Sequence, residues 1–74
     1  MIFNYSKLKG RIIEKYETRS EFAAAIGMTD ATLSSRLNNV TPFKADEIKA
    51  MCAPDILDIA DKDIPEYFFT LKVE

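Results

Sequence analysis

The chain has 74 residues, of which 47% are hydrophobic and 30% are charged, with a net charge of -2 and a single cysteine. This length suits one small domain, and the composition lies far from the weakly hydrophobic, highly charged range of disordered chains. Without histidine, and with Cys52 alone, the usual zinc-site spacings have no ligands, and no apolar run approaches the about 20 residues of a membrane span. We therefore expect a single domain over residues 1–74, without metal or other cofactor, in the cytoplasm.

Charge is unevenly distributed along the chain. Residues 1–44 carry seven Lys or Arg against four Asp or Glu, a balance of +3, whereas residues 45–74 carry three against eight, a balance of -5. Only the first part is therefore suited to face phosphates. Four aspartates lack the glycine and closing glutamate of a calcium loop and predict a solvated acidic surface: Asp55, Asp58, Asp61 and Asp63.

The first predicted helix begins at Asn4 or Ser6, either of which can cap it, and runs to about Tyr16 because apolar residues recur at three- and four-residue spacing. Gly10 lies inside this helix, where it is either tolerated or required by close packing. A capping box over residues 18–21 then predicts a second helix over residues 19–26.

A tight turn and a third helix follow. Gly27 supplies the positive-φ residue that a sharp turn needs, and Thr29 can cap the next helix. Leu33 and Leu37, one turn apart, predict its buried side. Two short helices joined by such a turn form a helix-turn-helix pattern, here about residues 18–38.

The remaining residues predict a fourth helix and a mixed tail. Thr41-Pro42 can start a helix that runs to about Cys52, and residues 55–60 predict a further short helical segment. In the tail, Phe69, Leu71 and Val73 alternate as in a short strand. The tail aromatic residues either form a dimer surface or close the core over the first helix.

Residues 19–38 resemble the helix-turn-helix unit of the Cro and cI-type phage repressors. The similarity includes the small Ala23 inside the first helix of the unit, Gly27 at the turn and Leu33 in the second helix. Residues 2–8, 37–39 and 66–69 resemble small phage-associated regulators that carry this domain. The resemblance implies an all-α, compact five-helix Cro/repressor-like domain, and it leaves a short extended C-terminal segment open. It also implies a phage or prophage transcriptional regulator that binds double-stranded operator DNA as a homodimer.

The outward face of residues 30–38 is then the candidate reading surface, because Leu33 and Leu37 point inward. The predicted base contacts are Ala31, Thr32, Ser34, Ser35 and Asn38. The predicted phosphate contacts are Arg19, Ser20, Arg36, Asn39, Thr41 and Lys44. For Arg36 an equal alternative is that its stem covers the core while its head stays in water.

A second class of function remains open. No Arg, Lys or Gln lies at the centre of the reading face, and Asp30 at its edge would repel phosphate. The same fold can serve as a protein-interaction module, such as a modulator or antirepressor that binds a partner phage repressor, with the acidic second part facing a basic surface. We do not expect an enzyme, because the chain lacks histidine, a phosphate-binding glycine loop and a catalytic cluster.

Overall fold

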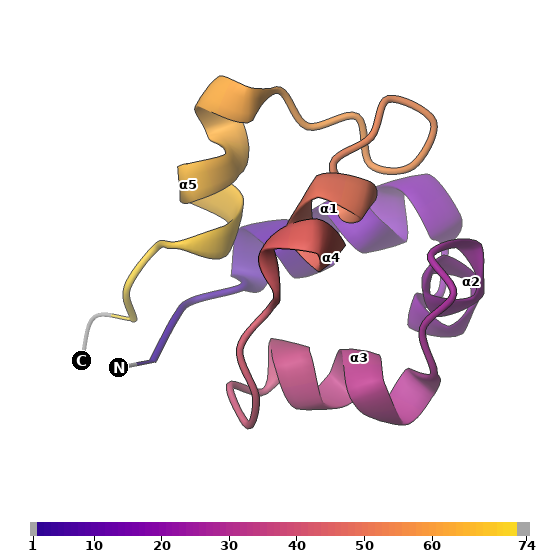
Figure 1. Cartoon of the computed structure of the whole chain (residues 1–74), viewed down its shortest axis with the longest axis horizontal. Helices are drawn as coiled ribbons and strands as arrows, with labels where there is room; N and C mark the ends of the chain where they lie inside the picture. The colour runs from indigo at the N-terminus through magenta and orange to yellow at the C-terminus, as the bar shows by residue number, and fades with distance from the viewer. Residues whose placement is uncertain (1, 73–74) are drawn as a thin grey trace.

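The computed structural model describes residues 2–72 of the chain (Figure 1). Its elements in chain order are α1 (Ser6–Tyr16), α2 (Arg19–Ala25), α3 (Asp30–Leu37), α4 (Ala45–Met51), a short 3-10 turn η1 (Asp61–Asp63) and α5 (Ile64–Phe68). Within the described residues, the one β-type pairing is an isolated antiparallel bridge between Phe3 and Leu71. The predicted all-α, five-helix fold class is therefore confirmed.

Threonine caps define the starts of α2 and α3, as the sequence predicts. The Thr18 hydroxyl accepts a hydrogen bond from the Glu21 N–H at 3.2 Å, and the Thr29 hydroxyl accepts one from the Thr32 N–H at 3.1 Å. Each bond satisfies a backbone donor that a helix N-terminus leaves without an internal partner. These two caps set where α2 and α3 begin.

The two glycines lie in open space but in different backbone conformations. Gly27 has a φ of 70°, which lets the Met28 N–H reach the Ala23 carbonyl at 2.8 Å and close α2. Gly10 is an ordinary helical residue of α1, and an added Cβ there would meet no atom within 4 Å. Gly10 is therefore tolerated by α1 rather than required by close packing.

Helix α4 starts later than the sequence predicts. The expected start was Thr41-Pro42, but the first helical residue is Ala45. The Glu47 carboxylate accepts a hydrogen bond from the Lys44 N–H at 2.9 Å, so the helix N-terminus is satisfied at this later position. Residues 41–44 instead belong to the connection between α3 and α4, with Lys44 in an extended conformation.

The expected short helix over residues 55–60 does not form. The chain turns over residues 52–57, and the Leu57 N–H bonds back to the Met51 carbonyl at 3.1 Å. Asp58 has a left-handed φ of 52°, a conformation that ends a right-handed helix. The segment is therefore an ordered loop between α4 and η1.

The tail contains less extended structure than the sequence predicts. Residues 67–68 belong to α5, and the predicted alternation of Phe69, Leu71 and Val73 is reduced to the bridge between Leu71 and Phe3. Val73 lies outside the described residues. The N–H of Asn4 donates to the Thr70 carbonyl at 2.7 Å, so the first and last described segments lie side by side (Figure 1).

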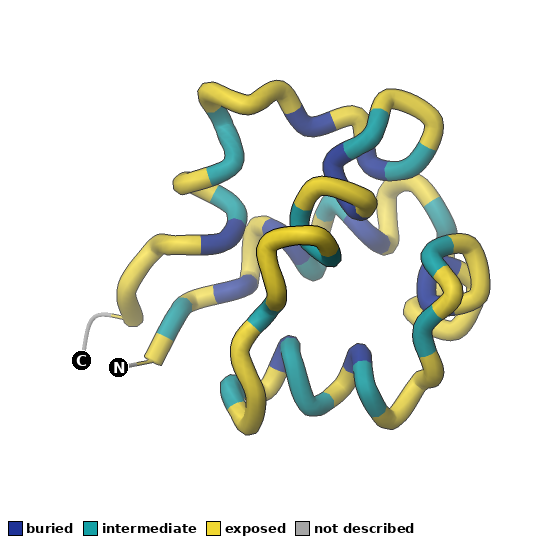
Figure 2. Tube along the Cα trace, in the orientation of Figure 1, coloured by how far each residue is buried: buried dark blue, intermediate teal, exposed yellow. Residues whose placement is uncertain are grey.

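One hydrophobic core joins the helices, and its residues line their inner sides (Figure 2). Phe68 is only 1% exposed and meets Phe43 edge-on, with the ring centroids 5.4 Å apart. The core interpretation of the tail is thus confirmed for Phe68, whereas Phe69 stays 51% exposed. None of the described helices has the length and apolarity to cross a membrane. The largest fully buried side chains are those of Leu8, Ile12, Phe22, Leu33, Leu37, Met51, Leu57 and Phe68.

Candidate functional site

The outward face of α3 brings the predicted base-contact residues together. Leu33 and Leu37 are buried and fix the rotation of the helix. Of the predicted base contacts, Ala31, Ser34 and Asn38 are exposed, whereas Thr32 and Ser35 are half-buried. The helix rotation expected from the sequence is therefore correct, and the face it presents is short, polar and uncharged.

Local hydrogen bonds already engage several side chains on this face. The Thr29 hydroxyl donates to the Thr32 hydroxyl at 2.9 Å, and the Asn38 amide donates to the Ser34 hydroxyl at 3.2 Å. Bidentate recognition of adenine by Asn38 would require its amide group to leave Ser34. The face thus offers few unengaged polar groups to a base edge.

Ser20, a predicted phosphate contact, faces an acidic group instead. Its hydroxyl donates to the Asp30 carboxylate at 2.8 Å, which links the start of α2 to the start of α3. Asp30 is stabilised there by the helix dipole. The same negative charge repels a phosphate that approaches Ser20. The predicted phosphate contacts Arg19 and Lys44 are both exposed.

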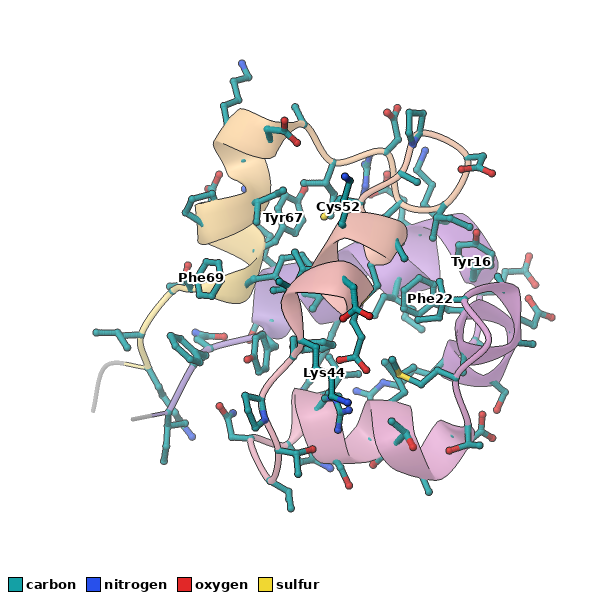
Figure 3. The ribbon with its side chains drawn as sticks, viewed as in Figure 1. Tyr16, Phe22, Lys44, Cys52, Tyr67 and Phe69 are labelled. Atoms are coloured by element: carbon teal, nitrogen blue, oxygen red, sulfur yellow. The ribbon has the colours of Figure 1, made fainter. Side chains whose placement is uncertain are left out.

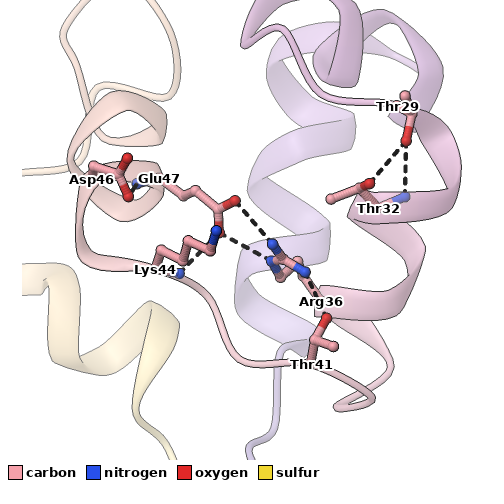
Figure 4. A network of polar contacts seen from close by, with 7 residues as sticks. All are labelled: Thr29, Thr32, Arg36, Thr41, Lys44, Asp46 and Glu47. Atoms are coloured by element: carbon pink, nitrogen blue, oxygen red, sulfur yellow. Dashed lines mark hydrogen bonds and ion pairs between the residues drawn. The ribbon is translucent and has the colours of Figure 1, made fainter.

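Arg36 forms a bidentate ion pair with Glu47 that joins α3 to α4 (Figure 4). Its Nε donates to one carboxylate oxygen at 3.0 Å and its Nη2 to the other at 3.1 Å, while Nη1 donates to the Thr41 hydroxyl at 2.6 Å. The side chains of Arg36 and Glu47 are only 12% and 18% exposed. The guanidinium group of Arg36 therefore stabilises the packing of two helices instead of extending into water, and its phosphate contact stays a prediction.

The ion pair also perturbs both titrating groups. The hydrogen bond from Arg36 holds the pKa of the Glu47 carboxyl below its ordinary value, and burial opposes this shift. The same bond raises the pKa of the Arg36 guanidinium. Both groups are charged near neutral pH, and together they add no net charge to this side of the molecule.

Asn39 serves as a structural clamp. Its Oδ1 accepts a hydrogen bond from the Phe3 N–H at 2.9 Å, and its Nδ2 donates to the Phe3 carbonyl at 3.0 Å. The amide side chain thus pairs with the N-terminal segment as a neighbouring strand would. Sequence reasoning missed this role, because no local pattern connects two residues so far apart in the chain. The Glu47 partner of Arg36 was missed for the same reason.

The geometry defines a small helix-turn-helix domain in which Arg36 is paired with Glu47, whereas Arg19 and Lys44 are exposed. Among residues 2–72, no group of three or more Cys, Asp or Glu side chains is placed to hold a metal ion.

The comparisons with known proteins identify the family. Residues 1–71 match the family model described as "Protein of unknown function (DUF739)", and the chain belongs to this family. The chain is also 40% identical to the modulator of repression (MOR) of the temperate bacteriophage TP901-1 from Lactococcus lactis. The two structures superpose with a TM-score of 0.80, over 100% of this chain and 97% of that chain. None of the curated proteins compared with the chain is significantly similar to it.

These comparisons correct the sequence prediction of a Cro/cI-type regulator that binds operator DNA. The similar phage protein is a modulator of repression, so both the predicted family and the predicted function are wrong. The physical reason is that the motif residues encode packing. Ala23 and Leu33 are buried and Gly27 has a positive φ, so these residues specify the α2–turn–α3 geometry, which by itself does not define a function. The individual base and phosphate contacts stay predictions, now without the operator-binding function that they served.

Proposed function

We propose that this protein modulates repression by binding a partner phage repressor. The observation that carries the proposal is the 40% identity, over the whole described length, to a phage modulator of repression. The proposal includes no catalytic step. It treats residues 1–74 as one interaction domain that works in the cytoplasm, where a repressor meets its operator.

The surface charge supports a protein partner over DNA. The chain carries a net charge of -2, and Arg36 is neutralised by Glu47. A protein that neutralises several phosphates needs accessible cations, and on the α2–α3 side this leaves Arg19 and Lys44. A repressor, in contrast, carries a cationic surface for its operator, and an acidic partner is electrostatically complementary to such a surface.

Titration of the purified protein with the purified repressor of the same phage tests the proposal. We expect a complex with a Kd of about 1 μM or lower by calorimetry, and a change in the repressor's affinity for its operator when the modulator is added. The repressor of an unrelated phage is the matched control and should not bind.

The DNA arm of the experiment separates the two classes of function. The protein alone, titrated with operator DNA and with scrambled DNA, is expected to show no preference between them at physiological salt. Specific operator binding by the protein alone, together with no repressor complex, would overturn the proposal.

A further inference from the structure

A groove lies on the side of the molecule formed by α4 and residues 58–64. Its volume is about 620 Å³, and its lining is mostly apolar. Ile48 and Ile64 are half-buried at its sides, while Cys52 and Ile59 are only 7% and 6% exposed at its floor. Figure 3 shows Cys52 at the end of α4, beside the segment that leads to α5. The small side chain of Ala60 leaves the groove open.

Hydrogen bonds from Arg11 of α1 hold one wall of the groove in place. The Arg11 Nε donates to the Leu57 carbonyl at 2.9 Å, and its Nη2 donates to the Asp58 carbonyl at 3.1 Å. These bonds fix the loop that forms one wall against α1. A groove with rigid walls loses little conformational entropy when a partner enters it.

The rim of the groove is acidic. Asp58 and Asp61 line it together with one cation, Lys49. The wider segment, residues 45–64, carries six carboxylates against two lysines. Burial raises the pKa of the Cys52 thiol to about 11, and the negative charge of Asp61 adds to the shift. The Cys52 thiol at the floor of the groove therefore stays uncharged at neutral pH.

We infer that this groove is a docking site for a basic amphipathic segment of the partner repressor, with an apolar side chain in the groove and cations beside Asp58 and Asp61. The inference rests on the proposed function, because a repressor supplies a cationic, partly apolar segment. A second copy of this chain fits worse. A symmetric dimer through the groove would place the same carboxylates against one another.

Two variants and one control test the docking site by titration with the purified repressor. Asp58→Asn combined with Asp61→Asn removes the rim charge, and asparagine tolerates the positive φ of position 58. Ala60→Phe fills the groove without changing the charge. Glu17→Gln combined with Glu21→Gln removes the same number of charges from exposed positions outside the groove.

We expect each groove variant to weaken the complex about tenfold or more, and the control to change its Kd less than about twofold. Circular dichroism and a ¹⁵N–¹H spectrum establish that each variant is folded. The charge variant should also flatten the salt dependence of binding.

The remaining outcomes separate the docking site from the proposed function. If the wild type binds the repressor and both groove variants bind equally well, the docking inference is overturned while the proposed function stands. If the wild type forms no complex with the repressor, both are overturned. A wild-type dimer that Ala60→Phe dissociates would assign the groove to a second copy and would also overturn the inference.

Discussion

Asn39 stabilises the fold through contacts that its position at the end of α3 does not reveal. It closes α3 in a left-handed conformation, with a φ of 61°, and its amide forms both hydrogen bonds to Phe3. Asn39→Ala removes both bonds and places alanine where an L-residue is disfavoured. We expect a loss of about 2–3 kcal/mol in the free energy of unfolding, measured in urea.

The neighbouring asparagine is the control for this measurement. Asn38 is exposed, and its side chain bonds only to Ser34 within the described structure. Asn38→Ala should therefore change the free energy of unfolding by less than about 0.5 kcal/mol. Equal losses in the two variants would contradict the clamp role of Asn39.

Glu47 predicts a pH dependence of stability with a defined sign. Its pKa in the folded protein is held below its ordinary value, chiefly by the hydrogen bond from Arg36. The stabilisation is therefore complete above the ordinary pKa and is lost as the pH falls through the lowered folded value. Glu47→Gln should destabilise the protein at about pH 7 and much less at about pH 2, measured by urea unfolding across this range. A constant difference at both pH values would exclude the ion pair as its cause.

At the scale of single residues, the sequence predicts which side chains face outward better than it predicts which contacts they make. The spacing of Leu33 and Leu37 correctly turns Ala31, Ser34 and Asn38 outward. The roles of Arg36 and Asn39 depend on Glu47 and Phe3, which no local pattern connects to them. A partner distant in the sequence decides whether an arginine is a free cation, and local spacing does not reveal that partner.

At the scale of the elements, the two glycines differ in their backbone conformation. Gly10 and Gly27 are both open to an added methyl group, but only Gly27 has a positive φ. We expect Gly10→Ala to stabilise the protein by about 0.5–1 kcal/mol and Gly27→Ala to destabilise it by about 1 kcal/mol or more. Thermal unfolding of the two variants measures the opposite shifts in Tm. Shifts of the same sign would show that backbone conformation does not determine the effects of the two substitutions on Tm.

Element boundaries could be predicted where the chain carries its own local signal. Thr18 and Thr29 cap α2 and α3 as expected, because a threonine hydroxyl reaches a backbone N–H a few residues later. The predicted start of α4 was wrong because the Glu47 carboxylate satisfies the Lys44 N–H and so places the helix N-terminus at this later position. The predicted short helix over residues 55–60 was wrong because Asp58 adopts a left-handed conformation. Aspartate permits this conformation but does not require it.

At the scale of the whole molecule, the tail aromatic residues divide between core and surface. Phe68 is 1% exposed, whereas Phe69 is 51% exposed and lies edge-on to Phe3 at 5.9 Å. Phe68→Ala should cost about 3–5 kcal/mol and leave a domain of this size largely unfolded. Phe69→Ala should cost about 1 kcal/mol and leave it folded. Circular dichroism during urea unfolding compares the two, and a well-folded Phe68→Ala variant would contradict the core role.

The pairing of the two ends has a consequence for the order of folding. The bridge between Phe3 and Leu71 closes the largest loop of the described chain, whereas α1, α2 and α3 meet through short connections. Closing a long loop costs more chain entropy than closing a short one. The end pairing should therefore form after the first three helices and open before them. Its amide hydrogens, on Asn4 and Lys72, should exchange with solvent deuterium faster than those in the middle of α1.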